Sequence, residues 1–139
     1  MIAVDASLAL KLVLDEPGST AARELWQRWT DSREVLIAPV LFCAETFSGL
    51  RRSVYSGRLS QEDGDRAYTI LDNLTVELRE PNQLYGTAWQ FAQRFQRPTV
   101  YDCCYLALAA ITQCEFWTAD RRLANAVGNQ LQWLHLLET

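Results

Sequence analysis

The sequence predicts a single α/β domain in three layers, with a central, mostly parallel sheet and helices on both of its faces. Short apolar runs alternate with longer segments in which apolar residues recur at helical spacing. This alternation indicates parallel strands, because consecutive parallel strands need a long crossover that is usually a helix. The 139 residues are enough for one compact core, and they contain no repeat, linker or long run of like charge. We therefore expect one domain over residues 1–139.

The first half of the chain alternates buried strands with amphipathic helices. Its expected elements, in order, are a strand Ile2–Val4, a helix from Ala6 to about Leu14, a helix through Trp29, a strand Val35–Ala38, a helix to about Tyr55 and a helix to about Leu71. Pro17 and Ser19 give start signals for the second helix. Pro39 suits the first turn of the third helix, which Gly57 ends. The segment Ser60–Asp63 has the form of a capping box and opens the fourth.

The second half continues the pattern and contains the most apolar helix. Its expected elements are a strand Thr75–Leu78, a helix that ends before Pro98, a helix to Ile111, a strand Glu115–Thr118, a short helix Arg121–Val127 and a last strand Leu131–Leu134. Asn82 is interpreted as an N-cap, and Thr99 with Asp102 repeats the spacing of a capping box. The run Cys103–Ile111 is apolar almost all round, which predicts a central helix that is covered on every side.

Composition favours a reduced, cytoplasmic protein. The cysteines lack the paired spacing of a zinc site and are expected to be buried thiols; they are Cys43, Cys103, Cys104 and Cys114. The N-terminus enters an apolar run without a basic leader or a long apolar segment, so we expect neither export nor a membrane partner. The net charge of -4 argues against a large uniform positive field for nucleic acid. A catalytic site for nucleic acid remains compatible with it.

Four carboxylates fall where a parallel sheet gathers functional groups. In open α/β sheets, ligands bind beyond the carboxyl ends of the strands. Asp5 ends the first strand, Asp120 follows Thr118 at the end of a late strand, and Asp102 begins the helix that leads into that strand. Glu45 lies in an apolar stretch of helix, where a lone carboxylate is costly to bury. Carboxylates brought together repel one another, and a hard divalent cation is the ordinary compensation.

Such a cation, for which Mg²⁺ is the first candidate, could orient and deprotonate a water and neutralise charge on a phosphodiester. The predicted reaction class is therefore hydrolytic phosphoryl transfer. The only histidine, His135, lies away from every acidic motif, which disfavours ribonucleases that use paired histidines. Each acid also has a plain structural alternative. The three aspartates could cap helices, and Glu45 could pair with Arg51 or Arg52.

Five sets of segments resemble successive motifs of VapC-type PIN domains, in the expected order from end to end. They are Asp5-Ala6-Ser7 with Lys11 and Glu16, Ala44-Glu45, Gly57–Ser60, Tyr101-Asp102 with Tyr105–Ala109, and Thr118–Leu123. The resemblance implies a PIN-like fold and an endoribonuclease that depends on Mg²⁺ or Mn²⁺. It also implies a homodimer and a small cognate antitoxin, so that the chain would be the toxin of a toxin-antitoxin pair.

The resemblance also implies roles for individual residues. By position, the family's acidic quartet corresponds to Asp5, Glu45, Asp102 and Asp120, of which the three aspartates are the implied metal ligands. Ser7 and Thr118 match supporting polar positions, and Ser48 is the third expected supporting polar residue, with a shorter side chain near the site. The sequence departs from the family pattern at Ser48, where asparagine is frequent, and at Cys103 and Cys104, where alanine or another apolar residue is usual. The arginines expected to contact RNA are Arg121 and Arg122, with solvated helix faces as the alternative.

Two rival functions share part of this pattern. A metal-dependent phosphatase or a receiver-type phosphoacceptor also places aspartate at the end of a parallel strand. Ser7 stands where such a phosphatase needs a second acid, and the only lysine, Lys11, lies too early for a receiver. The other rival is a non-catalytic interaction module whose acidic pocket accepts an arginine from a partner. Trp26 and Trp29 fit the core better than a partner groove.

Overall fold

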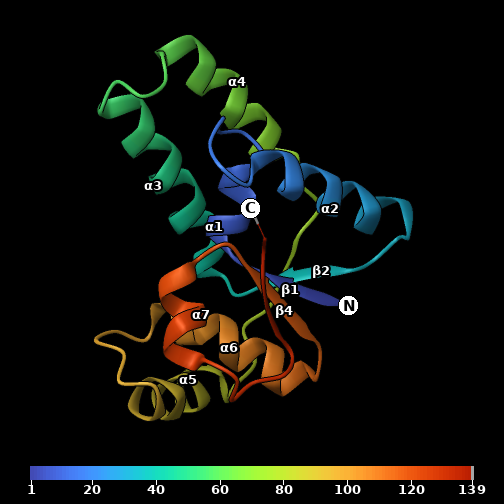
Figure 1. The fold of residues 1–139 in the computed structure, drawn as a ribbon, viewed down its shortest axis with the longest axis vertical. Helices are drawn as coiled ribbons and strands as arrows, with labels where there is room; N and C mark the ends of the chain where they lie inside the picture. Colours follow the sequence, from blue (N-terminus) through green and yellow to red (C-terminus); the bar gives the residue numbers. More distant parts are fainter. Residues whose placement is uncertain (139) are drawn as a thin grey trace.

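The computed structural model describes residues 1–138 as a five-stranded, all-parallel sheet with helices on both faces (Figure 1). The strands are β1 (Ile2–Val4), β2 (Leu36–Ala38), β3 (Glu77–Leu78), β4 (Glu115–Thr118) and β5 (Leu134–Leu136). Their order is β3-β2-β1-β4-β5, which puts β1 in the centre. The helices are α1 (Ala6–Lys11), α2 (Ser19–Asp31), α3 (Leu41–Tyr55), α4 (Gln61–Asp72), α5 (Leu84–Arg94), α6 (Tyr101–Thr112) and α7 (Arg121–Val127).

The helices divide into two groups, one on each side of the sheet. Figure 1 shows α1 to α4 on one side and α5 to α7 on the other. The chain moves from β1 out to β3 through the first group and then crosses back to β4 and β5 through the second. This is the arrangement that right-handed crossovers produce when the direction of progress along the sheet reverses. The predicted three-layer α/β fold is confirmed.

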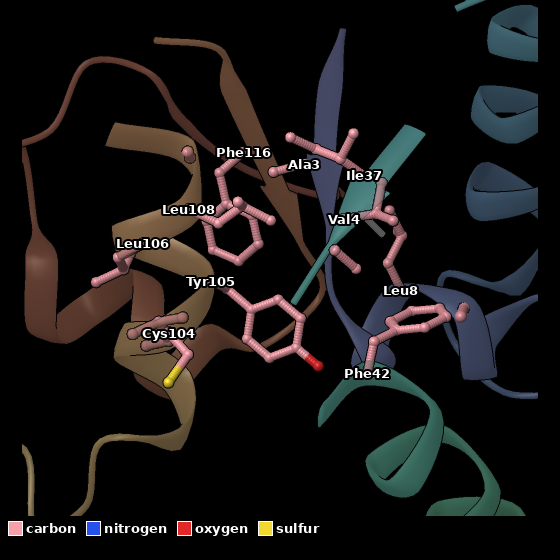
Figure 2. Close-up of a cluster of buried hydrophobic side chains, with 14 of the residues drawn as sticks. Ala3, Val4, Leu8, Ile37, Phe42, Cys104, Tyr105, Leu106, Leu108 and Phe116 are labelled. Atoms are coloured by element: carbon pink, nitrogen blue, oxygen red, sulfur yellow. The ribbon is translucent and has the colours of Figure 1, made fainter. Parts of the chain in front are cut away.

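Helix α6 is the apolar centre of the second group, as its sequence predicts. Its residues Cys103 to Ala109 are all buried. Tyr105 stacks on Phe116 of β4 with ring centroids 6.0 Å apart. Figure 2 shows its ring within the apolar cluster and its hydroxyl oxygen directed toward α3. The core therefore fixes a polar group at the boundary between the two helix groups.

Several predicted helix starts are wrong in detail. Helix α5 begins at Leu84 after Gln83, so Asn82 is not its N-cap, and no side chain caps it. Helix α6 has Val100 at its N-cap without a side-chain bond, so the Thr99 capping box does not form. Turns and tertiary packing start these helices instead, which spacing alone does not reveal. Ser60 does cap α4, because its Oγ accepts from the Asp63 backbone N-H at 3.0 Å.

Two further boundaries differ from the prediction. The last strand is Leu134–Leu136 rather than Leu131–Leu134, because Leu131 is drawn into the core and residues 132–133 turn before the strand begins. Pro39 precedes the third helix instead of lying in its first turn, since Val40 occupies the N-cap position. A run of alternating apolar residues leaves the starting point of a strand open, and packing decides it.

Helix α3 lies unusually close to α1, and this contact helps to position the site. Gly49 faces Leu10, and a Cβ added at Gly49 would clash with the end of that side chain. Glu45 stands one turn before Gly49 on α3. The close approach therefore fixes Glu45 relative to the helix that follows Asp5. Within residues 1–138, no helix is both long and apolar enough to cross a bilayer.

Candidate active site

Asp5 lies at the carboxyl end of the central strand, where β1 and β4 run side by side in parallel. Its side chain is almost fully buried, with a relative exposure of 6%. Ser7 Oγ donates to Oδ1 at 2.6 Å, Thr118 Oγ1 donates to Oδ2 at 2.5 Å, and the Leu8 backbone N-H donates to Oδ1 at 3.1 Å. Both carboxylate oxygens are thus held in place by residues of β4 and α1.

The same two hydroxyls join Asp5 to the loop that carries Asp120. Thr118 Oγ1 accepts from the Asp120 backbone N-H at 3.0 Å, and Ser7 Oγ accepts from the Ala119 N-H at 3.0 Å. The oxygens of Ser7 and Thr118 are 3.3 Å apart. Residues 115 positions apart in sequence are therefore fixed at one edge of the sheet, as the sequence analysis predicts for Asp5 and Asp120.

The pKa of Asp5 is raised from its ordinary value of 3.8 to about 6. Burial is the main cause, and the nearby charge of Asp120 raises the pKa a little further. The hydrogen bonds from Ser7, Thr118 and Leu8 act in the opposite direction but do not offset burial. Among residues 1–138 no lysine or arginine forms an ion pair with Asp5. A buried carboxylate without a cationic partner is the central feature of this site.

Asp5 and Asp120 also cap helices, so the structural alternative applies to both. Asp5 is the N-cap of α1, and Asp120 is the N-cap of α7. Asp120 Oδ1 accepts from the Arg122 N-H at 2.9 Å and from the Leu123 N-H at 3.3 Å. A cap and a ligand are compatible roles for a carboxylate, because its two oxygens offer more than two lone pairs. Capping fixes the side-chain orientation that a ligand needs.

Glu45 is held by Tyr105, a residue to which sequence reasoning assigned no role. Tyr105 Oη donates to Glu45 Oε1 at 2.6 Å, joining α6 to α3. The pKa of Glu45 is raised, first by burial; the hydrogen bond from Tyr105 opposes this shift, and the charge of Asp102 adds to it. Arg52 lowers the pKa only through its charge, and no ion pair of Glu45 with Arg51 or Arg52 is found in residues 1–138. Burial and Glu45 both raise the pKa of Tyr105, which keeps it a donor.

Asp102 has an unpredicted partner in Arg97. It lies in the first turn of α6 and does not cap the helix. Arg97 Nη2 lies 3.1 Å from Asp102 Oδ2, with side-chain exposures of 19% and 35%. The Nε of Arg97 is buried and has no hydrogen-bond partner. Arg97 lies in an irregular loop, where no helix or strand periodicity indicates the direction of a side chain. This ion pair could therefore not be predicted from the sequence.

The four predicted acids thus form two pairs. Asp5 and Asp120 are linked through Ser7 and Thr118. Asp102 lies close enough to Glu45 for its charge to raise the pKa of Glu45. Carboxylate and hydroxyl oxygens are the donors that Mg²⁺ or Mn²⁺ prefers, so the chemistry of these side chains fits such a cation. Within residues 1–138, however, no three Asp, Glu, His or Cys side chains are gathered into one ready ligand group.

Positive side chains flank the first pair. A cavity of about 540 Å³ is lined by Ser7, Lys11, Asp120, Arg121 and Arg122. A second cavity of about 690 Å³ shares Ser7 and Lys11 with it and extends to two arginines of the α3 region, Arg52 and Arg58. The two predicted RNA-contacting arginines therefore lie beside Asp120.

Ion pairs hold part of this positive rim in place. Glu16 Oε1 lies 3.0 Å from Lys11 Nζ, and Glu16 Oε2 lies 3.6 Å from Arg58 Nη2. These ion pairs join the motif that contains Lys11 and Glu16 to the motif Gly57–Ser60. Ser48, in contrast, is exposed on α3 and makes none of the contacts described above.

Comparison with known proteins gives a consistent result. A family model described as the PIN domain matches residues 2–129. The curated Ribonuclease VapC9 of Mycobacterium tuberculosis is 35% identical over 125 residues, which cover 90% of each chain. The solved structure of M. tuberculosis VapC20, described as a sarcin-ricin loop cleaving toxin, has a TM-score of 0.67 at 19% identity and covers 91% of this chain and 95% of that one. A toxin-antitoxin complex from Klebsiella pneumoniae has a TM-score of 0.68 at 12% identity, over 99% of this chain and 98% of that one.

The burial of Asp5 predicts a specific pH dependence of stability in the absence of divalent metal. Between pH 3.8 and about 6 the folded protein keeps a proton on Asp5 that the unfolded chain has released. The free energy of unfolding should therefore fall as pH rises through this window, by on the order of 3 kcal/mol. Asp5→Asn keeps the shape but cannot ionise, so it should remove this part of the decline and be more stable than the parent at neutral pH.

Urea unfolding in EDTA at a series of pH values measures this difference. Asp65→Asn, which replaces an exposed acid on α4, is the matched control and should follow the parent's profile. Parallel profiles for Asp5→Asn and the parent would show that Asp5 is not the buried, uncompensated group described above.

Proposed function

The chain belongs to the PIN-domain family, and on that premise we propose that it is a divalent-metal-dependent endoribonuclease, the toxin of a toxin-antitoxin pair. The predicted family is confirmed by the match over residues 2–129, and the solved structures of similar fold include VapC toxins. A toxin endoribonuclease is the function that these similarities support. We further propose that the reaction requires Mg²⁺ or Mn²⁺, which would supply an activated water for the hydrolysis of RNA phosphodiesters.

The observation that carries this proposal is the buried carboxylate of Asp5, which has hydroxyl partners and, among residues 1–138, no cationic side chain paired with it. Burial raises the cost of ionising Asp5 above that of a carboxyl in water, and a bound divalent cation would supply a compensating charge. We assign Asp5, Asp102 and Asp120 as the residues that would hold the metal. The metal would supply Lewis-acid charge and lower the pKa of a bound water.

The remaining polar residues have supporting roles in this proposal. Glu45 is the fourth acid, and Tyr105 fixes its carboxylate from the core. Ser7 and Thr118 orient Asp5 and anchor the Asp120 loop. Arg97 holds Asp102 through an ion pair, so a metal bound by Asp102 would replace the guanidinium as its counter-charge. In this proposal these side chains orient the acids that would hold the cation.

The rival function is a non-catalytic interaction module. The Arg97–Asp102 ion pair favours it, because one acid of the pocket is already paired with a guanidinium. The two functions differ in their response to metal. A nuclease site should gain stability from Mg²⁺ because the ion binds the folded state, whereas a guanidinium pocket should gain none.

Replacement of Asp102 by Asn tests the nuclease proposal directly. Asp102→Asn should abolish cleavage of total RNA by the purified protein with Mg²⁺ or Mn²⁺. It should also lose most of the rise in melting temperature that the metal gives the parent. Without metal, the variant should be less stable than the parent by at most about 1 kcal/mol, because it loses a partly exposed ion pair with Arg97.

The control is again Asp65→Asn, which should cleave RNA and respond to metal as the parent does. An Asp102→Asn protein that still cleaves RNA and is still stabilised by Mg²⁺ would refute the assignment of Asp102. A parent protein that neither cleaves RNA nor responds to either metal would favour the interaction module.

We also propose that Arg121 and Arg122 contact RNA phosphates. Both are exposed and line the cavity beside Asp120. The double replacement Arg121→Gln with Arg122→Gln should weaken RNA binding and flatten its dependence on salt, because fewer phosphate contacts release fewer counterions. Fluorescence anisotropy over a range of NaCl concentrations measures both quantities. Arg28→Gln, on the exposed side of α2, is the control, and an equal effect from it would argue against a localised rim.

The family similarity further supports a homodimer and a small antitoxin as partners. One of the solved structures of similar fold is a toxin-antitoxin complex. We propose that the antitoxin places an arginine against the acidic pocket, since a guanidinium suits paired carboxylates. Affinity purification from the native host at native expression level should recover a small protein, and light scattering should give the mass of a dimer of this chain. A monomer without a small partner would contradict both assignments.

A further inference from the structure

A groove beside Asp102 carries two exposed aromatic rings that the site described above does not use. It has a volume of about 730 Å³ and is bordered by α5 and by the loop that leads into α6. Trp89 and Tyr101 both line it, with exposures of 62% and 59%. The groove adjoins the acids, because Tyr101 precedes Asp102 and Arg97 is both a lining residue and the ion-pair partner of Asp102.

Trp89 differs from the other tryptophans of the chain. Trp26, Trp29, Trp117 and Trp133 are at least partly buried and each packs against another ring. Within residues 1–138, neither Trp89 nor Tyr101 makes a ring contact. Large aromatic side chains normally bury their faces. Two rings that are left open in one groove offer flat surfaces on which another planar group can stack.

The charge of the groove points to the class of ligand. The chain as a whole has a net charge of -4, yet among residues 1–138 no acidic residue lines this groove. Its one charged lining residue is Arg97, whose buried Nε lacks a partner. The polar lining includes the amides of Gln93 and Gln96 and the hydroxyl of Thr99. The lining itself thus adds no negative charge against a polyanion, and the edges of planar, hydrogen-bonding groups can find donors and acceptors there.

We propose that this groove binds unpaired bases of the RNA substrate, which stack on Trp89 and Tyr101 and so hold the adjoining phosphodiester toward Asp102. The inference rests on the proposed nuclease function and names a substrate class for it, single-stranded RNA. Stacking on aromatic rings is tolerant of sequence, and it is available only where bases are unpaired. The polar amides in the lining of the groove suit bases better than they suit the apolar face of a partner helix.

The test measures binding without cleavage, using the full chain in EDTA and a short, unstructured, fluorescent RNA oligonucleotide. Trp89→Ala and Tyr101→Ala should each raise Kd by roughly 5- to 100-fold, the range found when a stacking ring is removed. Trp89→Phe and Tyr101→Phe, which keep a ring, should bind within a few-fold of the parent. Tyr68→Ala removes a half-exposed ring of α4, outside this groove, and should leave Kd unchanged.

Two further readouts separate stacking from a structural effect. The slope of log Kd against log salt should be the same for the Ala variants and the parent, because no charge is lost. An oligonucleotide with abasic positions in place of the contacted bases should bind the parent as weakly as the Ala variants bind the intact RNA. The Ala variants should keep the parent's stabilisation by Mg²⁺, which shows that the acidic site is intact.

The outcomes are distinguishable. If the parent cleaves RNA and the Ala variants bind as the parent does, the groove proposal fails and the nuclease proposal stands. If the Ala variants change the molecular mass in solution and not the RNA affinity, the groove is an interface between copies of the chain, and the proposal fails. A parent that neither cleaves nor binds RNA overturns both proposals.

Discussion

The burial of one carboxylate, that of Asp5, is the constraint on which the rest of the site depends. Strand β1 is central in the sheet, so the residue that ends it is enclosed by β4 and by the start of α1. Burial alone would favour the protonated form, and three hydrogen bonds counter it only in part. Those bonds come from Ser7, Thr118 and the Leu8 backbone N-H. The two hydroxyls also accept from the Ala119 and Asp120 backbone N-H groups and so fix the loop that carries Asp120. The other site residues are therefore arranged around a buried carboxyl group that, among residues 1–138, has no cationic side chain to compensate its charge.

The part of this arrangement that strand ends determine could be predicted from the sequence. A short apolar run followed by an aspartate marks Asp5, and the same signal marks Asp120 after Thr118. Parallel neighbours bring such ends together regardless of their separation along the chain. The burial of Cys103 and Cys104 follows in the same way from a helix that is apolar all round. Cys43 and Cys114, also predicted to be buried, are only partly so, because each lies at the margin of the core.

The features that the sequence could not predict are contacts between elements and positions in loops. Tyr105 is one apolar-patterned residue among many in α6, and only the packing of α6 near α3 brings its hydroxyl to Glu45. Arg97 belongs to a loop whose path sets the Asp102 ion pair, and a loop has no periodicity from which to read a direction. The groove of Trp89 and Tyr101 likewise exists because one residue lies on α5 and the other begins α6. Amphipathic spacing identifies which side chains face a core, but it does not identify which exposed side chains face one another.

The two acid pairs differ in how firmly they are held, and this difference suggests how the site responds to a cation. Asp5 is fixed by the central strand and by buried hydroxyls, so it cannot move without disturbing the sheet edge. Asp102 is about one third exposed and is held by a single arginine, whose own Nε is unsatisfied. A partly exposed ion pair stabilises a protein by at most about 1 kcal/mol, so the pair with Arg97 offers little resistance to a rearrangement of Asp102. In the proposed metal site, Asp5 would therefore be the fixed side and Asp102 the side that can adjust.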